Sequence, residues 1–299
     1  MEISIFGHLT IDEIEFVDGS MKTAPGGTSF YSSITSRILG SSTKIYSIVG
    51  GDYPDEYLEE LSKIGVDISR VVKNNRCRTT RYRIRYRDDA REMYLIQKAP
   101  KIIIKEVEGL DTIYLGPVAG EITEDDIVNF SRRFKTALDP QGMLRTVDKS
   151  GKIRLEKKLD IKILKDLWIL RLSQEEAEIM TGLADPVKAG ERLLKIGIEN
   201  IILSMGSKGF IAMNKEKKYF IPPYPKVKIV DPTGAGDVLG SAFLVELSRS
   251  GDLAWASSVG ASATSIALED YGIRSMLSKD FRNKLNERAT EIFNMIKVL

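Results

Sequence analysis

Short apolar runs alternate along the chain with longer stretches in which apolar residues recur every three to four positions. The short runs have the length of buried strands, and the longer stretches have the period of amphipathic helices. Predicted strands cover residues 3–6, 44–49, 112–115, 136–138, 168–172 and 200–204. Predicted helices cover about residues 29–39, 54–64, 124–134, 175–180, 186–196, 252–269 and 279–296. This alternation predicts an α/β fold with a mostly parallel central sheet, helices on both faces and ligands at the carboxyl ends of the strands.

A segment rich in arginine interrupts this alternation. Seven arginines lie between Arg76 and Arg91, and over Arg81–Arg87 they alternate strictly with apolar residues. This is the period of a half-exposed strand, with Asp88-Asp89-Ala90 as a hairpin turn before a second strand at 92–96, so we expect a small sheet outside the main one. The arginines either form a solvated or subunit-facing surface, or one of them reaches a phosphate or polar substrate. Nucleic-acid binding fits less well, because aromatic and basic residues lie on opposite faces.

Composition predicts a soluble globular protein with a small substrate. The chain has 299 residues, 42% hydrophobic and 29% charged, and we expect a single domain over residues 1–299. Lys and Arg (44) nearly balance Asp and Glu (42), so the net charge of +2 gives no field that would attract a nucleic acid or an anionic membrane. No stretch approaches the about 18 apolar residues of a membrane span, and the first residues do not resemble a signal peptide, so we expect a cytoplasmic location.

The chain contains one cysteine and one histidine. Cys77 therefore cannot form an internal disulfide, and a histidine-rich zinc site is excluded. His8 follows the first predicted strand, where it either lies near a ligand or is hydrogen-bonded at the strand end. Any catalysis must depend on carboxylates, backbone amides, lysine and arginine.

A glycine-rich turn in the C-terminal part of the chain carries the strongest chemical signal. The pattern predicts a strand, a tight turn and a helical stretch at residues 227–230, 231–237 and 238–247. Because Gly234 and Gly236 have no Cβ, the backbone can bend tightly and an anion can reach the amides of residues 234–236. Asp237 would repel a bound phosphate unless it takes a proton from an attacking hydroxyl while the amides hold the phosphoryl group. The alternative is an ordinary strand-to-helix turn capped by Asp.

Two other phosphate-binding patterns fit this turn poorly. A P-loop needs Lys followed by Ser or Thr after its second Gly, and the chain has no such pattern. A dinucleotide fingerprint needs Gly where Leu239 stands, and it should open the first βαβ unit rather than lie near the end.

The turn sequence Asp231-Pro232-Thr233-Gly234-Ala235-Gly236-Asp237 is similar to the C-terminal signature of the ribokinase or PfkB family of sugar and nucleoside kinases. Near the start of the chain, Gly7-His8-Leu9-Thr10-Ile11-Asp12 resembles the family's first-strand loop, and Pro25-Gly26-Gly27 resembles its N-terminal signature. The resemblance implies a ribokinase-like fold, ATP as phosphate donor and Asp237 as catalytic base. It also implies an anion hole formed by Gly234, Ala235 and Gly236. The acceptor site that it implies includes Asp12, Gly26 and Gly27.

The same resemblance implies a nucleotide side. Leu203–Gly209 resembles the family's phosphate loop, and Ser173-Gln174-Glu175-Glu176 stands where the family has Asn-x-x-Glu, with Ser173 departing from the Asn. Glu176 would organise a Mg²⁺ ion held through phosphates and water, and Asp231 with the carbonyl of Thr233 resembles a monovalent-cation site that implies K⁺ activation. The residues implied to bind the nucleotide are Ser173, Glu176, Ser204, Gly206, Gly209 and Ala261.

Departures from the family pattern bear on the acceptor. Where many sugar kinases have Asn after Gly-Gly, this chain has Phe30-Tyr31-Ser32. Asp139–Gly142 followed by Met143-Leu144-Arg145 is closer to the branch that contains archaeal and plant myo-inositol kinases. We therefore expect a polyol, sugar or cyclitol as acceptor, with myo-inositol favoured and with Tyr31 and Gln141 among its ligands. The alternatives are a nucleoside kinase of the same fold, in which Tyr31 stacks on a base, and a catalytically silent nucleotide-binding protein.

The arginine hairpin corresponds to the family's β lid. We expect the lid to be formed by about residues 9–24 and 76–98. A lid of this type often completes a neighbour's site, so the resemblance implies a homodimer through the lid.

Overall fold

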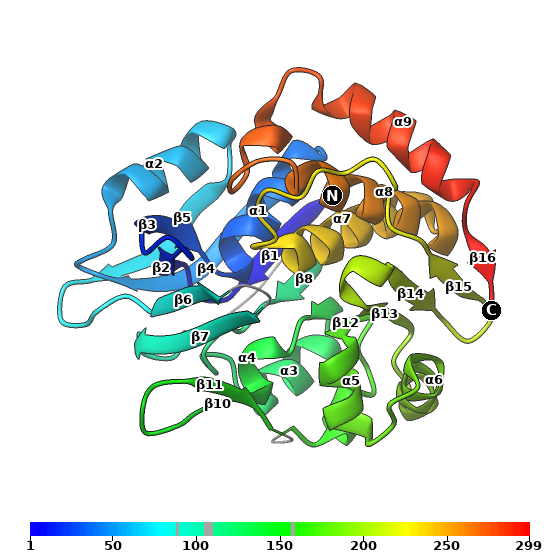
Figure 1. Cartoon of the computed structure of the whole chain (residues 1–299). Coiled ribbons are helices and arrows are strands. Elements are labelled where there is room, and N and C mark those ends of the chain that lie inside the picture. Colours follow the sequence, from blue (N-terminus) through cyan, green and yellow to red (C-terminus); the bar gives the residue numbers. More distant parts are fainter. Residues whose placement is uncertain (88–89, 105–109, 157–158) are drawn as a thin grey trace.

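The structure is a computed structural model of the whole chain and describes residues 1–87, 90–104, 110–156 and 159–299. Within these residues the central sheet has ten strands, and Figure 1 shows it in the middle of the molecule. In order across the sheet, they are β16 (Lys297–Val298), β15 (Lys218–Ile221), β14 (Phe210–Met213), β13 (Asn200–Ser204), β12 (Ile169–Ser173), β9 (Lys135–Leu138), β8 (Thr112–Leu115), β1 (Glu2–Phe6), β4 (Ser42–Gly50) and β5 (Asp67–Asn74). Neighbours from β13 to β5 are parallel, and β14 to β16 are added in antiparallel order. The predicted mostly parallel sheet is confirmed.

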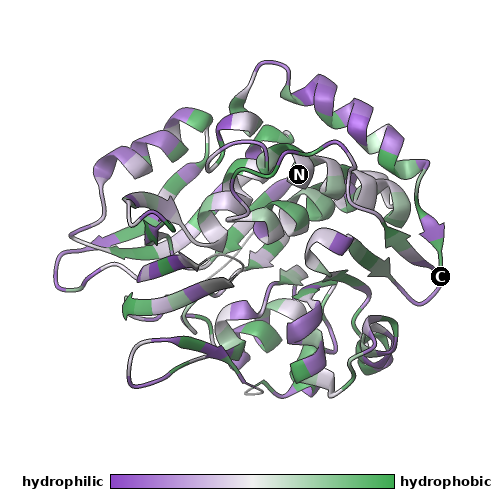
Figure 2. Ribbon diagram, viewed as in Figure 1, coloured by the Kyte–Doolittle hydropathy of each residue, from purple (hydrophilic) through white to green (hydrophobic). Residues whose placement is uncertain are grey.

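Helices cover both faces of this sheet (Figure 1). One face carries α1 (Thr28–Ile38), α2 (Asp55–Ile64), α7 (Ala235–Ser250), α8 (Leu253–Ala267) and α9 (Phe281–Phe293). The other carries α3 (Glu124–Ser131), α5 (Gln174–Thr181) and α6 (Pro186–Ile196), while short α4 (Gln141–Leu144) follows β9. Because successive side chains of a strand point to opposite faces, each strand contributes to the hydrophobic core on both faces of the sheet. In β1, Ile3 and Ile5 pack in the core under α1 and α7, and Phe6 packs in the core on the opposite face. Figure 2 shows that the outer helices α2 and α9 are largely hydrophilic, whereas much of α7, between α8 and α1, is hydrophobic.

A second sheet forms a lid beside the carboxyl ends of the central strands (Figure 1). Its strands, in order, are β3 (Met21–Gly26), β2 (Thr10–Glu15), β6 (Arg81–Arg87) and β7 (Ala90–Gln97). On its inner face Tyr82 and Ile84 are buried against Val118. The predicted small sheet is therefore confirmed.

Arg81, Arg83 and Arg85 of β6 lie on the other face of the lid. Arg83 Nη2 is 2.8 Å from Glu13 Oε2, Arg85 Nε is 2.7 Å from Glu15 Oε2, and Arg81 also pairs with Glu13. These three guanidinium groups bind carboxylates of the neighbouring strand β2. For these three arginines, the interpretation as a surface of the lid therefore fits better than contact with a phosphate or substrate. The predicted turn includes Asp88 and Asp89, which lie outside the described residues.

The predicted strand at residues 227–230 is wrong, because this segment is irregular. Both sides of the preceding strand β15 are already occupied, by β14 and β16, so an additional strand has no free edge there. Instead, the Val230 amide donates to the Leu268 carbonyl at 2.7 Å. Helix α7 begins at Ala235, three residues before the predicted start. The prediction also missed β5 and the hairpin of β10 (Arg145–Val147) and β11 (Ile153–Leu155).

None of the helices within the described ranges has the length and apolar character needed to cross a membrane.

Candidate active site

A cavity of about 180 Å³ lies where the lid, the carboxyl ends of the central strands and the start of α7 meet. Its lining residues come from segments far apart in the sequence: Thr10, Asp12, Gly27, Thr28, Tyr31, Tyr82, Met93, Val118, Gln141, Arg145, Arg171 and Pro232 to Asp237. The structure thus brings together nine of the predicted site residues, namely Asp12, Gly27, Tyr31, Gln141, Thr233, Gly234, Ala235, Gly236 and Asp237.

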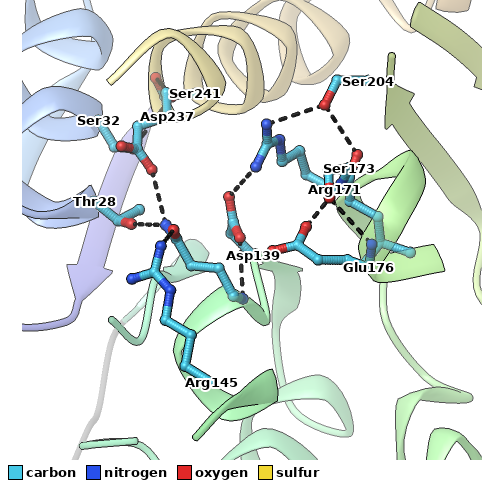
Figure 3. A network of polar contacts seen from close by, with 12 residues as sticks. Thr28, Ser32, Asp139, Arg145, Arg171, Ser173, Glu176, Ser204, Asp237 and Ser241 are labelled. Carbon is cyan, nitrogen blue, oxygen red and sulfur yellow. Dashed lines mark hydrogen bonds and ion pairs between the residues drawn. The ribbon is translucent and has the colours of Figure 1, made fainter. Parts of the chain in front are cut away.

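Asp237 lies in the first turn of α7, near Thr28 (Figure 3). Gln141 Nε2 donates to Asp237 Oδ1 at 3.5 Å and to Thr28 Oγ1 at 2.9 Å. The hydroxyls of Ser32 and Ser241 donate to the main-chain carbonyl of Asp237 at 3.3 and 2.6 Å, which fixes the start of the helix. The carboxylate is therefore held at the cavity by contacts from α1, α4 and α7.

The pKa of Asp237 is raised above the ordinary value of 3.8. Removal from bulk water is the largest cause, because an ionised carboxylate is poorly solvated inside the protein. The guanidinium of Arg171, a hydrogen bond with Thr28 and the charge of Arg145 all lower this pKa, whereas the nearby Asp12 raises it. The balance leaves a carboxylate that is more basic than an exposed aspartate.

Gly234 is the N-cap of α7 and has a φ of 76°, in the left-handed region. A Cβ at this position would also lie 2.5 Å from the ring of Tyr31. Both backbone conformation and close packing therefore require glycine here. The consequence is a helix start whose amides can open toward the cavity, as the predicted anion hole requires.

The predicted acceptor residues lie on the lid side of the cavity. Asp12 is buried, and Thr10 Oγ1 donates to its Oδ1 at 2.8 Å. Gly26 is not among the lining residues; a Cβ there would lie 2.1 Å from Asp12 Oδ2, so its role in the structure is to make room for that carboxylate. Gly27, with a φ of 89°, lines the cavity itself and caps α1.

Arg145 is a cavity residue to which the sequence analysis assigned no specific role. Its Nη2 donates to Gln141 Oε1 at 2.6 Å, and its Nη1 donates to the Val118 carbonyl at 3.3 Å. The guanidinium carbon lies 5.8 Å from the ring centroid of Tyr82. Arg145 therefore orients the Gln141 amide, so that the nitrogen of this amide faces Asp237 and Thr28.

Arg171 is a second cavity residue that the sequence analysis missed. It lies in β12 between two buried leucines, Leu170 and Leu172. Its Nη1 is 2.9 Å from Asp139 Oδ2, and its Nη2 donates to Ser204 Oγ at 3.2 Å (Figure 3). Burial raises the pKa of Asp139 to about 7, and the Arg171 guanidinium is the largest influence in the opposite direction. A lone arginine within an apolar strand was the signal that could have identified it.

None of the predicted nucleotide residues lines the cavity, and Ser173 and Ser204 lie at the ends of β12 and β13. Ser173 caps α5: its Oγ accepts from the Glu176 amide at 3.1 Å, and Glu176 Oε2 accepts from the Ser173 amide at 2.7 Å (Figure 3). Gly206 and Gly209 have φ values of 60° and 97° in the turn after β13. Ala261 lies in α8 and is 9% exposed.

The remaining predicted ion ligand, Asp231, joins two loops. Its Oδ1 accepts from the Thr233 amide at 2.9 Å, and its Oδ2 accepts from the Gly272 amide at 3.2 Å. His8, in contrast, is fully buried away from the cavity, with its ring nitrogens bonded to Thr80 Oγ1 and the Pro100 carbonyl at 2.8 and 2.9 Å. The strand-end interpretation of His8 therefore holds.

Comparison with known proteins agrees with this geometry. Residues 2–280 match the pfkB family carbohydrate kinases. The chain is 29% identical over 262 residues to a cytidine kinase of Thermococcus kodakarensis, covering 83% of this chain and 89% of that protein. A solved pyrophosphate-dependent kinase of the ribokinase family, complexed with a pyrophosphate analog and myo-inositol, has a TM-score of 0.79 at 26% identity, over 90% of this chain and 96% of its own. A nucleoside kinase of Methanocaldococcus jannaschii, at 21% identity, a TM-score of 0.77 and coverage of 97% and 98%, shares the fold.

The family match extends over most of the chain, and the fold and the predicted signature turn agree with it. The chain belongs to the pfkB family of carbohydrate kinases and is a small-molecule kinase with the ribokinase-like fold that sugar and nucleoside kinases share.

Proposed function

We propose that this protein transfers the γ-phosphoryl group of ATP to a hydroxyl of a small polyol, sugar or cyclitol, with myo-inositol as the favoured acceptor. The observation that carries the proposal is the carboxylate of Asp237 in a cavity that also holds Asp12, Gln141 and Arg145. A base, hydroxyl-binding groups and the amides of the signature turn thus share one small space.

Asp237 is the proposed base. It accepts the proton of the acceptor hydroxyl while the hydroxyl oxygen bonds to the γ-phosphorus, and the bond from that phosphorus to the bridging oxygen breaks as ADP leaves. The amides of Gly234, Ala235 and Gly236, at the positive end of α7, hold the charge of the transferring group. Gln141 keeps the carboxylate in place through its hydrogen bond at 3.5 Å.

Bound Mg²⁺ supplies positive charge to the donor phosphates. Within the part of the chain that the structure describes, no group of three or more His, Cys, Asp or Glu side chains could hold a metal ion. This fits an ion held mainly by phosphates and water, with the carboxylate of Glu176 as the proposed organiser of those waters.

Asp231 and the carbonyl of Thr233 are the proposed ligands of K⁺. Asp231 already connects the signature turn to the loop at Gly272, so an ion there would stabilise the anion hole from outside the cavity. Equal turnover in K⁺ and in a bulky organic cation would argue against this role.

The surroundings of Tyr31 favour a polyol over a nucleoside. Tyr31 is 4% exposed and its ring packs against Gly234, which leaves little surface on which a base could stack. The polar groups of Asp12, Gln141 and Arg145 suit several hydroxyl groups instead. The solved relative with bound myo-inositol supports the same class of acceptor.

Two similarities support an alternative acceptor and an alternative donor, and the deciding experiment includes both. Similarity to a cytidine kinase supports a nucleoside acceptor, and similarity to a pyrophosphate-dependent kinase supports pyrophosphate as donor. The deciding experiment incubates the protein and Mg²⁺ with inositols, pentoses, hexoses and nucleosides, each with ATP or pyrophosphate, and identifies the product by NMR. A phosphorylated cyclitol or sugar supports the proposal, a nucleotide product replaces it, and donor binding without turnover on any acceptor indicates a silent binding protein.

We also propose a homodimer through the outer face of the lid, where Arg83 and Arg85 pair with Glu13 and Glu15. A monomeric mass by light scattering at micromolar concentration would remove this proposal.

A further inference from the structure

Arg171 lies on a central strand, and its side chain reaches Gly236 at the start of α7, in the predicted anion hole. It lies in β12 between β9 and β13, and its side chain is 12% exposed and contributes to the cavity wall. Asp139 at the end of β9 and Ser204 at the end of β13 hold its two terminal nitrogens from opposite sides (Figure 3). The guanidinium group is therefore fixed before any ligand binds.

The position of this guanidinium explains a glycine. A Cβ on Gly236 would lie 2.1 Å from Arg171 Nη2 and 2.5 Å from its Cζ. Gly236 is not among the glycines with positive φ, so its backbone conformation alone would accept other residues. Contact with Arg171 is what excludes a side chain there, and it places a permanent positive charge against the backbone of the predicted anion hole.

The guanidinium group of Arg171 also has N–H donors that its side-chain hydrogen bonds do not use. It carries five N–H groups, and its two side-chain bonds, to Asp139 and Ser204, use one each. Its Nε is buried and has no hydrogen-bond partner among the described residues. Buried donors of this kind are normally satisfied, so a ligand atom or ordered water is expected beside them.

We propose that Arg171 contacts the phosphate donor directly and supplies, together with the amides of residues 234–236, the positive charge that stabilises the transferring phosphoryl group. Asp139 and Ser204 are positioning residues for this guanidinium. The inference rests on the proposed phosphoryl transfer, and it adds an arginine provided by a central strand to a site otherwise made of backbone amides.

The first test measures donor binding without chemistry. Removing Arg171 alone would leave the buried Asp139 carboxylate without its partner, so Arg171→Ala is combined with Asp139→Asn. Calorimetry with pyrophosphate and with a non-hydrolysable ATP analogue, each with Mg²⁺, should show at least about tenfold weaker binding than in the wild type. Arg249→Met, at the far end of α7, is the matched arginine control and should bind like the wild type. Equal affinities in the wild type and the double variant would overturn the proposal even if the acceptor is not a polyol.

The second test measures turnover. Arg171→Ala/Asp139→Asn should lower kcat by about 10²- to 10³-fold, as for other groups that stabilise transition-state charge. The KM for the acceptor should change little, and guanidinium chloride below denaturing concentrations should restore part of the activity. A loss that guanidinium does not restore, with donor affinity unchanged, would assign Arg171 a purely structural role and contradict the proposal.

The third test uses the contact with Gly236. Gly236→Ala should lower the unfolding temperature of the wild type, because its Cβ meets the guanidinium. In the Arg171→Ala/Asp139→Asn background the same change should cost much less. An equal loss in both backgrounds would show that the guanidinium does not occupy the position on which the inference depends.

Discussion

The side-chain amide of Gln141 donates to the carboxylate of Asp237 at 3.5 Å, and the two residues come from helices that lie 96 positions apart in the sequence. Arg145 accounts for the orientation of this amide, because it donates to the amide oxygen at 2.6 Å and leaves the nitrogen to face Asp237. The arrangement connects Gln141, a proposed acceptor-binding residue, to the proposed base, so the protonation of Asp237 should be sensitive to residue 141.

Activity should depend on pH through Asp237. The base works when it is ionised, so kcat/KM should be full above its pKa and fall as the pH is lowered through it. Because burial raises this pKa above 3.8, the fall should occur at a higher pH than for an exposed aspartate. Gln141→Glu places a second negative charge beside Asp237 and should move the acid limb upward by about one unit or more. Profiles of kcat/KM against pH measure both effects.

The control for this prediction is Gln174→Glu, which makes the same chemical change at a half-buried position on α5 that does not line the cavity. Its profile should match the wild type. An acid limb that does not move in Gln141→Glu would mean that residue 141 does not contact the group that limits activity.

The two ends of α7 offer a matched pair of glycines. Gly234 and Gly251 have φ values of 76° and 67°, but a Cβ at 234 meets the Tyr31 ring at 2.5 Å, whereas nothing lies within 4 Å at 251. Gly251→Ala should therefore cost about 1 kcal/mol of the free energy of unfolding, from backbone strain alone. Gly234→Ala should cost about 2–4 kcal/mol, because close packing adds to the strain. Denaturant unfolding measures both; equal losses would contradict the packing seen here.

Aromatic contacts hold the tip of the lid against the body. The ring of Phe16 lies 6.3 Å from that of Tyr86 in the lid and 6.4 Å from that of Tyr271 in the body, and Tyr86 Oη lies 3.3 Å from Thr233 Oγ1. Phe16→Ala should loosen lid closure and raise the acceptor KM by about five- to tenfold, equivalent to about 1 kcal/mol.

The control for the lid is Phe293→Ala. It removes a comparable ring contact, with Trp255 at 5.9 Å, on α9 and away from the cavity. Steady-state kinetics should show a normal acceptor KM in this control. If the acceptor KM were similar in both variants, the contacts of Phe16 would not contribute to acceptor binding, contrary to the prediction.

The sequence predicted the layered sheet and about half of the residues that line the cavity because these depend on local signals. Apolar runs define the strands, and the glycine turn ending in Asp237 can be recognised without knowing its neighbours. The segment at 227–230 shows the limit of such signals: it is as apolar as a strand, yet both sides of the preceding strand β15 are occupied by β14 and β16. Strand pairing decides that outcome, and pairing is a property of the whole fold.

Arg145 and Arg171 could not be assigned for a similar reason. The role of Arg171 depends on Asp139 and Gly236, which the order of β9 and β12 and the start of α7 bring together. The hairpin arginines drew attention because they are numerous, whereas each cavity arginine stands alone among apolar or polar neighbours. The number of arginines in a segment therefore does not indicate which guanidinium group is buried beside a site.

The most direct measurement of the central claim is the turnover of Asp237→Asn on the acceptor identified by NMR, together with calorimetric binding of a non-hydrolysable ATP analogue. Asparagine keeps the shape of the side chain and cannot accept the proton, so kcat should fall by about 10²- to 10⁴-fold while the analogue still binds. A kcat near that of the wild type would contradict the assignment of Asp237 as the base.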